Sequence, residues 1–272
     1  MGRTVYVNGD YVDEAEAKIS VFDRGFLFAD GVYEVTSVLN GKLIDFEAHK
    51  ARLDRSLAEL DMAKPDVDLL PIHRELVARN KIDEGLVYLQ VPRGAADRDF
   101  AFPEAAEPSL VLFTQSKVLA ESPAAKNGIK VITVEDMRWA RRDIKTVQLL
   151  APSMCKMMAK KAGKVDAWRV EDGFATEGMS YNAYIVLEDV TLVTRNLSNA
   201  ILHGITRAAV LRYAAEAQIK SEERPFTVEE ATSAKEAFFT SASSFVCPVV
   251  EIDGHALGDG RPGTVAARLR ES

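Results

Sequence analysis

The 272-residue chain has few of the side chains on which several large classes of protein site depend. It contains two cysteines, Cys155 and Cys247, far apart and without a Cys-x-x-Cys spacing. Its four histidines are isolated and form neither a His-Glu-x-x-His nor a His-x-His pattern. The sequence gives little support to a disulfide framework, a thiolate metal site or a catalytic zinc, and we expect no metal in the function.

Basic blocks and long apolar runs are also lacking. The 34 lysines and arginines are outnumbered by 41 aspartates and glutamates, which leaves a formal charge of −7. A nucleic-acid backbone needs a basic block, so we expect no nucleic acid partner. No apolar run is long enough to span a bilayer, and "MGRTVYVNGDYV" has neither the basic nor the apolar region of a secretion signal. We expect no membrane partner and a cytoplasmic location.

The residues that are present predict a mixed α/β (α+β) fold. The chain is 47% hydrophobic and 28% charged, as globular proteins are. "VYVNGDYV" at 5–12 and "VYEVTSVLNGKLIDF" at 32–46 each centre on Asn-Gly, the strongest short signal for a β-hairpin. An antiparallel sheet is therefore expected in the first third. Two helices should follow, at 46–62 and 67–80, and then strands at 86–94 and 109–115.

The second half predicts another domain. The polar, proline-bearing stretch at 116–128 resembles a linker, so we expect a smaller N-terminal domain at 1–116, a linker at 117–124 and a larger C-terminal domain of mixed α/β structure at 125–272. Within that domain the pattern predicts helices around 152–163 and 203–218, strands at 129–136, 183–189 and 236–243, and a final hairpin near 250–260.

A lysine stands in an apolar setting in "RRDIKTVQLL", where Lys145 lies between Ile144 and Val147. A buried ammonium group is unfavourable unless it is paired or its nitrogen is bound covalently. The ordinary interpretation is a lysine whose stem covers apolar surface while its head reaches water. The residues alone leave both interpretations open.

Three further stretches carry polar groups at the ends of expected elements. In "TEGMSYNAYIVLED", Glu177 and Ser180 precede a strand, and an ordinary turn would also explain them. In "ILHGITRAA", Gly204 opens a helix whose free N–H groups suit a phosphate, although capping by Thr206 is the common alternative. "TSASS" at 240–244 leaves a strand with small hydroxyl residues. A reactive lysine, a carboxylate and a phosphate seat are the attachments that pyridoxal phosphate needs.

The order of these stretches resembles one known family. "DRGFLFADGVYEV", "RWARRDIKTVQLL", "TEGMSYN", "HGITR" and "FFTSASS" are similar to the fold-type IV pyridoxal-phosphate aminotransferases, most closely to the D-amino-acid aminotransferase branch. The resemblance runs over nearly the whole chain. It implies a two-domain fold-type IV enzyme with pyridoxal 5'-phosphate as cofactor. It also implies a ping-pong transfer of an amino group from a D-amino acid to a 2-oxo acid.

The resemblance assigns cofactor roles to particular residues. Lys145 matches the Schiff-base lysine, whose aldimine holds the cofactor and which shuttles a proton once released. Glu177 matches the carboxylate that keeps the pyridine nitrogen protonated. The phosphate would be bound by Arg52, by the helix start and by a second loop, with the matching residues Gly204, Ile205, Thr206, Ser241 and Ala242. The family often has threonine where this chain has Ala242, so one hydroxyl contact should be missing.

Substrate roles follow in the same way. Tyr33 and Ser180 match residues on the substrate side, and Arg98 matches an arginine that binds the substrate α-carboxylate. The resemblance implies a homodimer in which the Arg98 loop enters the partner's site. Two residues after that arginine the family has histidine, whereas this chain has Phe100, which should make the pocket more apolar.

Two alternatives remain open from the sequence. An (R)-selective amine transaminase would share the fold without needing a strong carboxylate trap. A non-catalytic protein that binds the cofactor or another phosphate ligand could keep the same scaffold, although Lys145, Glu177 and Arg52 together argue against it. The branched-chain branch fits less well, because "TEGMSYN" lacks its small Thr-Ala-like loop and the chain is short for that branch.

Overall fold

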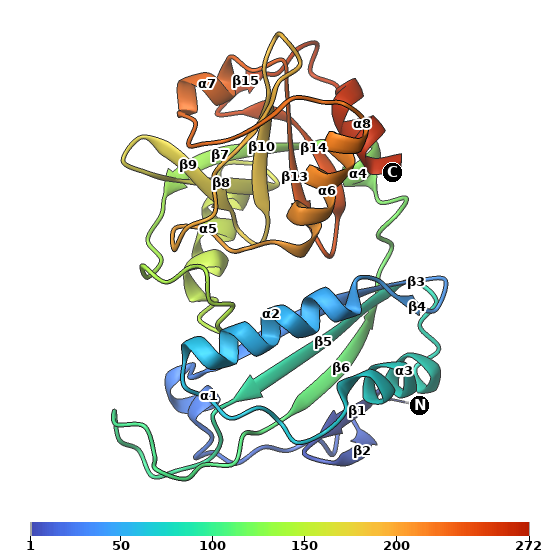
Figure 1. Ribbon diagram of the computed structural model, residues 1–272, viewed down its shortest axis with the longest axis vertical. Helices are drawn as coiled ribbons and strands as arrows, with labels where there is room; N and C mark the ends of the chain where they lie inside the picture. Colours follow the sequence, from blue (N-terminus) through green and yellow to red (C-terminus); the bar gives the residue numbers. More distant parts are fainter. Residues whose placement is uncertain (1, 272) are drawn as a thin grey trace. The chain divides into compact units, whose positions relative to one another are not determined.

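The structure is a computed structural model that describes residues 2–271, and the chain forms two compact units (Figure 1). The first unit comprises Met1–Val118 together with Ile144–Gln148. The second comprises Leu119–Asp143 and Leu149–Ser272. A short piece from the middle of the chain thus belongs to the N-terminal unit.

The first unit is built on a six-stranded sheet in which every neighbouring pair is antiparallel. Both predicted Asn-Gly hairpins are confirmed. Asn8 and Gly9 have φ of 49° and 109°, and Asn40 and Gly41 have φ of 51° and 69°, the left-handed backbone that a two-residue hairpin turn requires. The strands lie in the order β2 (Asp10–Asp13), β1 (Thr4–Val7), β6 (Val111–Ser116), β5 (Gly85–Pro92), β3 (Gly31–Leu39) and β4 (Lys42–Leu43).

Helices supply the other side of this core. After the short α1 (Arg24–Phe28), α2 (Phe46–Glu59) packs against β3, and α3 (Leu69–Arg79) packs against β1, β5 and β6. Both long helices are amphipathic and bury apolar residues at helical spacing, such as Leu53 and Leu57 on α2. Apolar side chains from α2, α3 and the sheet form one hydrophobic cluster.

The segment Ile144–Gln148 lies along the N-terminal half of β3, which β4 leaves uncovered. Thr146 forms an isolated bridge with Val32, and the N–H of Tyr33 donates to the carbonyl of Lys145 at 3.0 Å. Ile144 is 3% exposed and joins the core cluster. These contacts fix the backbone on both sides of Lys145.

The second unit contains a mixed nine-stranded sheet. Its main path is β12 (Ser221–Glu223), β11 (Leu192–Thr194), β10 (Asn182–Val186), β13 (Glu236–Ser241), β14 (Phe245–Ile252), β7 (Ile129–Glu135), β8 (Asp166–Glu171) and β9 (Phe174–Gly178), and β15 (His255–Ala256) pairs with β14. The pairs β11/β12, β14/β7 and β7/β8 are parallel, and the others are antiparallel. The expected fold class, with an antiparallel N-terminal sheet and a mixed C-terminal domain, is confirmed.

Both faces of the central strands are buried in apolar clusters. Tyr184 and Phe238 face the cluster that includes residues of α6 (Ile205–Glu216) and α8 (Thr264–Glu271), whereas the alternate residues Ile185 and Phe239 face another. The remaining helices are α4 (Pro123–Asn127), α5 (Leu150–Lys161) and α7 (Val228–Thr232). The polar stretch at 116–128 is therefore not only a connection, since Ser122 caps α4 by accepting from the Ala125 N–H at 3.2 Å. The linker at 117–124 and the domain bounds drawn from it stay a prediction.

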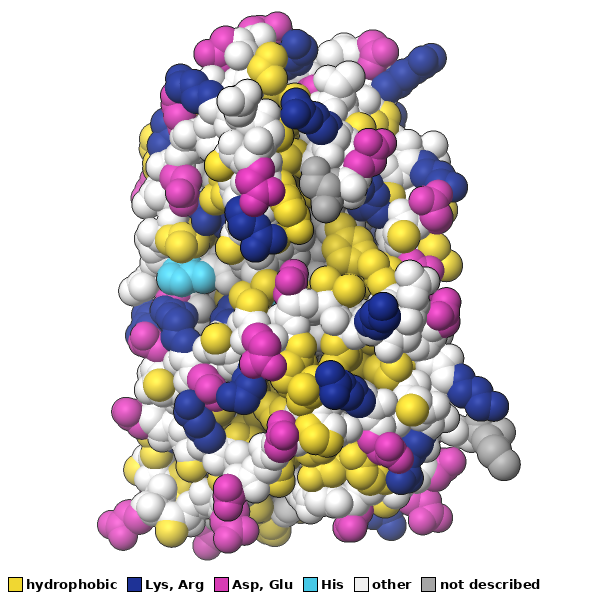
Figure 2. Space-filling view, turned by 45° about the vertical axis from the view of Figure 1, so that its right-hand side comes forward, with side chains coloured by type: hydrophobic (Ala, Val, Ile, Leu, Met, Phe, Trp, Pro, Cys, Tyr) yellow, Lys and Arg dark blue, Asp and Glu magenta, His cyan; other side chains and the backbone are white. Residues whose placement is uncertain are grey.

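Surface and composition features agree with a globular protein. On the face shown in Figure 2, lysine and arginine side chains are intermixed with aspartate and glutamate. Both cysteines are free and buried. Within residues 2–271, no helix is long and apolar enough to cross a membrane, and no group of three or more histidine, cysteine or acidic side chains is placed to hold a metal ion.

Candidate active site

Lys145 lies beside a row of stacked aromatic rings in the first unit. Its side chain is half-buried, and its Nζ is 4.3 Å from the centroid of the Tyr33 ring, a cation–π distance. Tyr33 stacks on Tyr88 at 5.6 Å, and Tyr88 stacks on Phe113 at 4.7 Å. Burial raises the pKa of Tyr88, so this phenol stays neutral. The lysine head therefore faces an aromatic surface.

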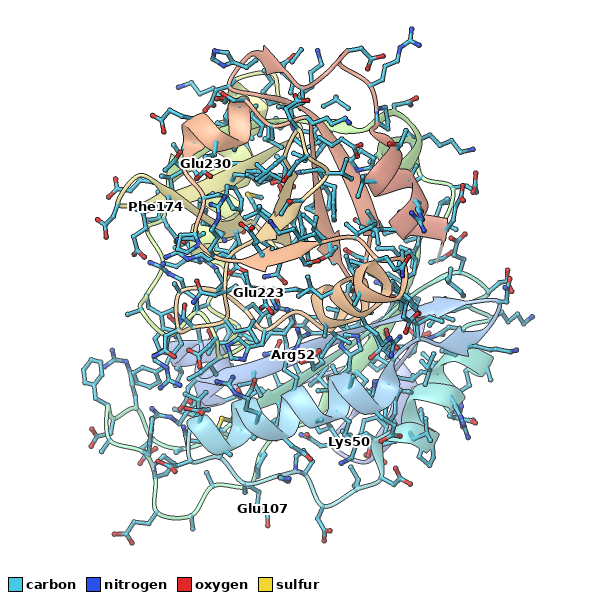
Figure 3. All side chains as sticks on the ribbon, turned by 45° about the horizontal axis from the view of Figure 1, so that its top comes forward. Lys50, Arg52, Glu107, Phe174, Glu223 and Glu230 are labelled. Carbon is cyan, nitrogen blue, oxygen red and sulfur yellow. The ribbon has the colours of Figure 1, made fainter. Side chains whose placement is uncertain are left out.

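Arg52 is fixed by a buried carboxylate. It projects from α2 to a different side from Lys50, two residues earlier (Figure 3). Its Nε donates to Glu34 Oε1 at 2.7 Å and its Nη2 to Glu34 Oε2 at 2.8 Å, while His49 Nδ1 lies 2.7 Å from Oε2. Burial alone would raise the pKa of Glu34, but the charge and hydrogen bonds of Arg52, together with His49, lower it to about 2. The Arg52 guanidinium is thus held in one orientation.

Arg98 and Phe100 are exposed on a loop whose backbone is anchored. Arg24 Nη1 donates to the carbonyls of Asp99 and Ala101, at 2.7 and 3.3 Å. The Arg98 guanidinium carbon lies 5.3 Å from the ring centroid of Phe28 and 5.6 Å from that of Phe100. The Phe100 side chain, at the position where the family has histidine, is 79% exposed.

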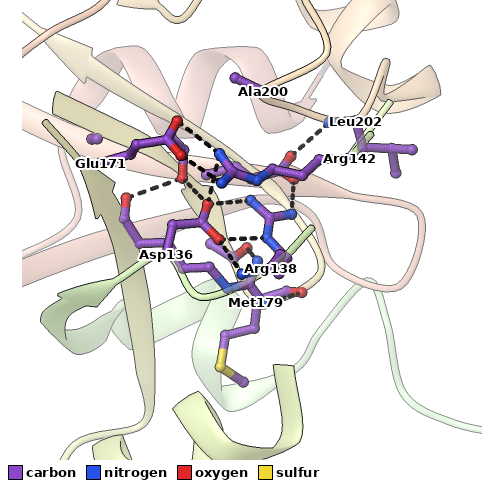
Figure 4. Close-up of polar contacts among 12 residues, drawn as sticks. Asp136, Arg138, Arg142, Glu171, Met179, Ala200 and Leu202 are labelled. Atoms are coloured by element: carbon purple, nitrogen blue, oxygen red, sulfur yellow. Dashed lines mark hydrogen bonds and ion pairs between the residues drawn. The ribbon is translucent and has the colours of Figure 1, made fainter. Parts of the chain in front are cut away.

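Glu177 lies near the end of β9 in the second unit and is 3% exposed. Arg138 Nη1 donates to its Oε1 in a short contact. Its Oε2 accepts from Asn182 Nδ2 at 3.0 Å and from the Leu202 N–H at 3.1 Å, and Figure 4 shows the contact from Leu202. Since a carboxylate has about four acceptor positions, these three donors leave one.

A charged network continues behind Arg138. Its Nε and Nη2 donate to Asp136 at 2.9 and 2.6 Å, and Thr176 Oγ1 donates to the same carboxylate at 2.7 Å. Arg142 lies 3.4 Å from Asp136 and pairs with Glu171 at 2.6 Å. Burial raises the pKa of Asp136, but Arg138, Thr176 and Arg142 outweigh it and lower the pKa to about 2. The network therefore remains ionised at neutral pH.

The predicted phosphate residues lie at one helix start and one strand end. Gly204 is the N-cap of α6, no side chain caps this end, and Ile205 and Thr206 are the first two helical residues. Capping by Thr206, the alternative explanation, is therefore wrong. Ser241 is the last residue of β13 and Ala242 follows it; both are half-buried. An uncapped helix start directs N–H groups and the positive dipole end outward.

Strand pairing places these second-unit residues together. Asn182 on β10 is opposite Thr240 on β13, directly before Ser241. The same asparagine contacts Glu177, and the N–H of Leu202 two residues before Gly204 donates to Glu177. Ser180 is exposed in the turn between β9 and β10, where the Gly178 N–H donates to the Tyr181 carbonyl at 2.9 Å.

Comparison with known proteins identifies the family. Residues 31–252 match the family model described as amino-transferase class IV. The chain belongs to the class IV aminotransferases. A D-alanine aminotransferase of Staphylococcus aureus (strain MSSA476) is 38% identical over 98% of this chain and 95% of its own length, and one of Bacillus licheniformis is 37% identical over 98% and 94%. The expected aminotransferase activity, the pyridoxal-phosphate cofactor and the resemblance to the D-amino-acid branch are confirmed.

Solved structures of other aminotransferases share the fold. A branched-chain amino acid aminotransferase from Escherichia coli superimposes with a TM-score of 0.90 at 20% identity, over 100% of this chain and 92% of that one. A fold IV-transaminase from Curtobacterium pusillum gives 0.81 at 22%, over 95% and 90%. Identities this low show the fold alone and do not distinguish between substrates.

The side chains present fit the cofactor of the class IV aminotransferases. Lys145 offers an amine, and Glu177 offers a carboxylate with one acceptor position left for a protonated ring nitrogen. The α6 start offers uncapped N–H groups to a phosphate.

Sequence reasoning gave no role to several of the residues that hold this class IV site. Glu34 had a usable signal: it alternates with Val32, Thr36 and Val38 on the buried face of β3, where a carboxylate needs a partner. His49 gave no such signal, because its partner Glu34 is 15 residues away. Arg138, which is paired with Asp136 and Glu177, was assigned no role either.

Proposed function

We propose that this class IV aminotransferase moves an amino group from a D-amino acid to a 2-oxo acid by a ping-pong reaction. The observation that carries the proposal is Arg98. Its described contacts are with two aromatic rings, so the guanidinium fork is available to an α-carboxylate. Arg138 and Arg142 instead pair with carboxylates of the chain itself. The similarity to D-alanine aminotransferases supports the same conclusion.

Each predicted site residue has a role in this reaction. Pyridoxal phosphate supplies the electron sink for the substrate carbon that loses its proton. Lys145 would hold the cofactor covalently and, once released, move a proton to and from the substrate Cα through Nζ. Glu177 would accept the hydrogen bond of the protonated ring nitrogen. The phosphate would be bound by Arg52, Gly204, Ile205, Thr206, Ser241 and the Ala242 backbone, and the substrate side would be lined by Tyr33, Ser180, Arg98 and Phe100.

The donor preference of the purified enzyme tests this function. We expect D-alanine to be deaminated in the presence of 2-oxoglutarate at a rate at least about tenfold above L-alanine, since Lys145 would serve one face of the cofactor and Arg98 would fix the side on which the α-carboxylate lies. Lys145→Ala is the matched control, and it should lose about 10²–10⁴-fold in turnover, as removal of a positioned acid–base group does. Equal rates for the two enantiomers, or turnover by Lys145→Ala within a tenth of wild type, would reject the proposal.

An (R)-selective amine transaminase is the second candidate, and one observation favours it. Phe100 presents an exposed phenyl ring beside Arg98, a surface suited to an apolar donor without a carboxylate. Comparing D-alanine with (R)-1-phenylethylamine at equal enzyme concentration separates the two. A larger kcat/KM for the amine would move this candidate ahead.

A homodimer forms part of the proposal, with Arg98 of each protomer serving the partner's site. It is supported by a set of exposed aromatic side chains in the first unit, at and around the Arg98 loop. These are Phe22, Phe26, Phe100 and Phe102, which are 54%, 69%, 79% and 55% exposed. A second copy of the chain would bury such rings, which are enriched at protein interfaces. The two free, buried cysteines are consistent with a cytoplasmic location.

Subunit mixing tests the shared site. In a hybrid of one Lys145→Ala and one Arg98→Ala subunit, one of the two sites would contain both the lysine and the partner's arginine. Mixing the two variants under conditions that exchange subunits should therefore restore D-alanine activity above the sum of the separate variants. If exchange is demonstrated by differently tagged subunits and no activity returns, Arg98 serves its own subunit.

A further inference from the structure

Asn182, the first residue of β10, closes a ring of hydrogen bonds with Glu177 and Leu202. It is 4% exposed, and its Nδ2 donates to Glu177 Oε2 and to the Leu202 carbonyl, each at 3.0 Å. The Leu202 N–H donates back to the same Glu177 oxygen at 3.1 Å. Both hydrogens of the amide are thereby used. The ring ties the end of β9 to the loop before α6.

The oxygen of the same Asn182 amide explains why position 204 is a glycine. A Cβ at position 204 would lie 2.1 Å from Asn182 Oδ1, far inside van der Waals contact. Gly204 has φ of −66° and ψ of 134°, a conformation open to any residue, so no backbone strain requires glycine there. The glycine is needed for the space that the Asn182 side chain occupies.

Asn182 is also linked to the second phosphate loop through the sheet. Its backbone is opposite Thr240 on β13, and Ser241 and Ala242 follow directly. The Asn182 side chain therefore lies next to Glu177, the carboxylate assigned to the ring nitrogen, and next to the helix start assigned to the phosphate. Its backbone pairs with the strand that leads to the second phosphate loop.

We propose that Asn182 is a positioning residue for the cofactor: it sets the Glu177 carboxylate and the α6 start at one fixed separation. This inference rests on the proposed cofactor roles of Glu177 and Gly204. Pyridoxal phosphate is a short, stiff molecule that is held at its ring nitrogen and at its phosphate. If the two attachment points are already held at the right separation, binding such a molecule costs no conformational entropy for ordering them. Attachment points that move independently must be ordered on binding, which weakens the affinity.

The first experiment tests the geometry without cofactor or turnover. Gly204→Ala, Asn182→Ala and the double variant are compared as cofactor-free proteins by urea unfolding. We expect Gly204→Ala to shift the midpoint strongly in the wild-type background and at most half as far in the Asn182→Ala background, where the amide oxygen is gone and the nearest remaining atom outside residue 182 is Arg207 Cβ at 3.2 Å. Equal shifts in both backgrounds would overturn the steric link between the two residues.

The second experiment separates positioning from general stabilisation. Thr194→Val is the matched control, because Thr194 Oγ1 donates to the Ala183 carbonyl at 2.9 Å from a buried position on the neighbouring strand and does not touch Glu177. The dissociation constant of pyridoxal phosphate is measured for each cofactor-free protein by equilibrium dialysis. A lost hydrogen bond to a charged acceptor corresponds to about 10–100-fold in binding, and we expect Asn182→Ala to lose at least tenfold and Thr194→Val less than threefold.

The outcomes distinguish this inference from the proposed function. Equal dissociation constants for the two variants would make Asn182 a structural residue only, even if D-alanine turnover is normal. A wild-type protein that binds the cofactor but does not deaminate D-amino acids would reject the proposed substrate. In that case the binding comparison would still decide the role of Asn182.

Discussion

Two glutamates, one in each unit, are equally buried but are held differently. Glu34 and Glu177 are each 3% exposed, and each contacts an arginine. Arg52 directs two nitrogens to Glu34 and closes a bidentate pair, and His49 adds a third contact. Arg138 gives Glu177 one nitrogen and directs two others to Asp136.

The difference distinguishes Glu34, a carboxylate that orients another side chain of the protein, from Glu177, a carboxylate that can bind a ligand. The Glu34 oxygens are occupied by the cation they orient, so this glutamate acts through Arg52. Glu177 shares its arginine with Asp136 and takes neutral donors on Oε2. Burial and an arginine partner therefore do not by themselves mark a ligand-binding glutamate. Each carboxylate accepts three described hydrogen bonds, so the difference lies in how the arginine is shared and in whether the other donors are neutral.

Among these variants, Glu177→Gln should have the largest effect on the reaction rate. The amide cannot hold the ring nitrogen in its protonated form, so the proton-removal step should slow by about 10²-fold or more, as with other groups that stabilise charge in a transition state. Stability should change less than for Glu34→Gln, because Arg138 keeps Asp136 as a partner. Single-turnover rates with D-alanine measure the first effect and urea unfolding the second. An unchanged single-turnover rate would remove Glu177 from the mechanism.

Glu34→Gln should give the largest loss of stability. It removes the carboxylate that pairs with the buried Arg52 guanidinium, and breaking a buried ion pair on one side reduces the free energy of unfolding by about 3–5 kcal/mol. Urea unfolding of the cofactor-free protein measures it, with Glu177→Gln as the comparison. A loss below about 1 kcal/mol would show that Arg52 does not depend on this carboxylate.

The pH dependence of stability sharpens the same contrast. The pKa of Glu34 falls from an ordinary 4.5 to about 2, so its contribution is complete above pH 4.5 and is lost as the pH falls from 4.5 towards 2. That loss is on the order of 3 kcal/mol and should be absent from Glu34→Gln. Burial lowers the pKa of His73 to about 4, so both proteins should also lose stability between pH 6.5 and 4. Parallel unfolding curves of the two proteins down to pH 3 would contradict the assignment.

Arg98→Ala extends the comparison to an arginine whose described contacts are with two aromatic rings. If Arg98 binds the α-carboxylate as we propose, with Phe100 in place of a second donor, kcat/KM for D-amino acids should fall by about 10–100-fold. The kcat/KM for (R)-1-phenylethylamine should hardly change, which makes this amine the internal control. Unaffected D-amino acid kinetics would place the carboxylate at another cation.

The smallest expected effect is that of Phe100→His. A histidine adds a donor next to Arg98, and kcat/KM for D-alanine or D-glutamate should rise by about 2–10-fold, the range of one ordinary hydrogen bond. Activity on (R)-1-phenylethylamine should decrease with the loss of apolar surface. A rise for the amine and a fall for D-alanine would reverse our interpretation of this position.

Local chemistry explains which parts of the fold were predictable. The two Asn-Gly hairpins need left-handed backbone that few other residues adopt, and α2 repeats leucines on one face, so the sequence alone specifies both. The hairpin of β8 and β9 was not predicted, although Asp172 and Gly173 also have positive φ at its turn. Because Val170, Thr176 and Glu177 mix apolar and polar side chains, the strands around that turn show no simple alternation.

The sequence proposes residues for the candidate site but not the contacts that hold them. Motifs around Lys145, Glu177 and Gly204 point to these residues because each motif is contiguous in sequence. The partners Glu34 and Arg138 are joined to Arg52 and Glu177 across 18 and 39 residues, and tertiary packing decides such contacts. No local periodicity carries that information.

Because Ile144–Gln148 belongs to the first unit, it affects which fragments of the chain can fold and when the first unit can fold during synthesis. A fragment that ends at Val118 would lack the core residue Ile144, the strand edge formed by Thr146, and Lys145 itself. During synthesis, the first unit must remain unfinished until the chain has passed through the opening strand of the second. No single cut between two consecutive residues can therefore release the N-terminal unit as an independently complete part.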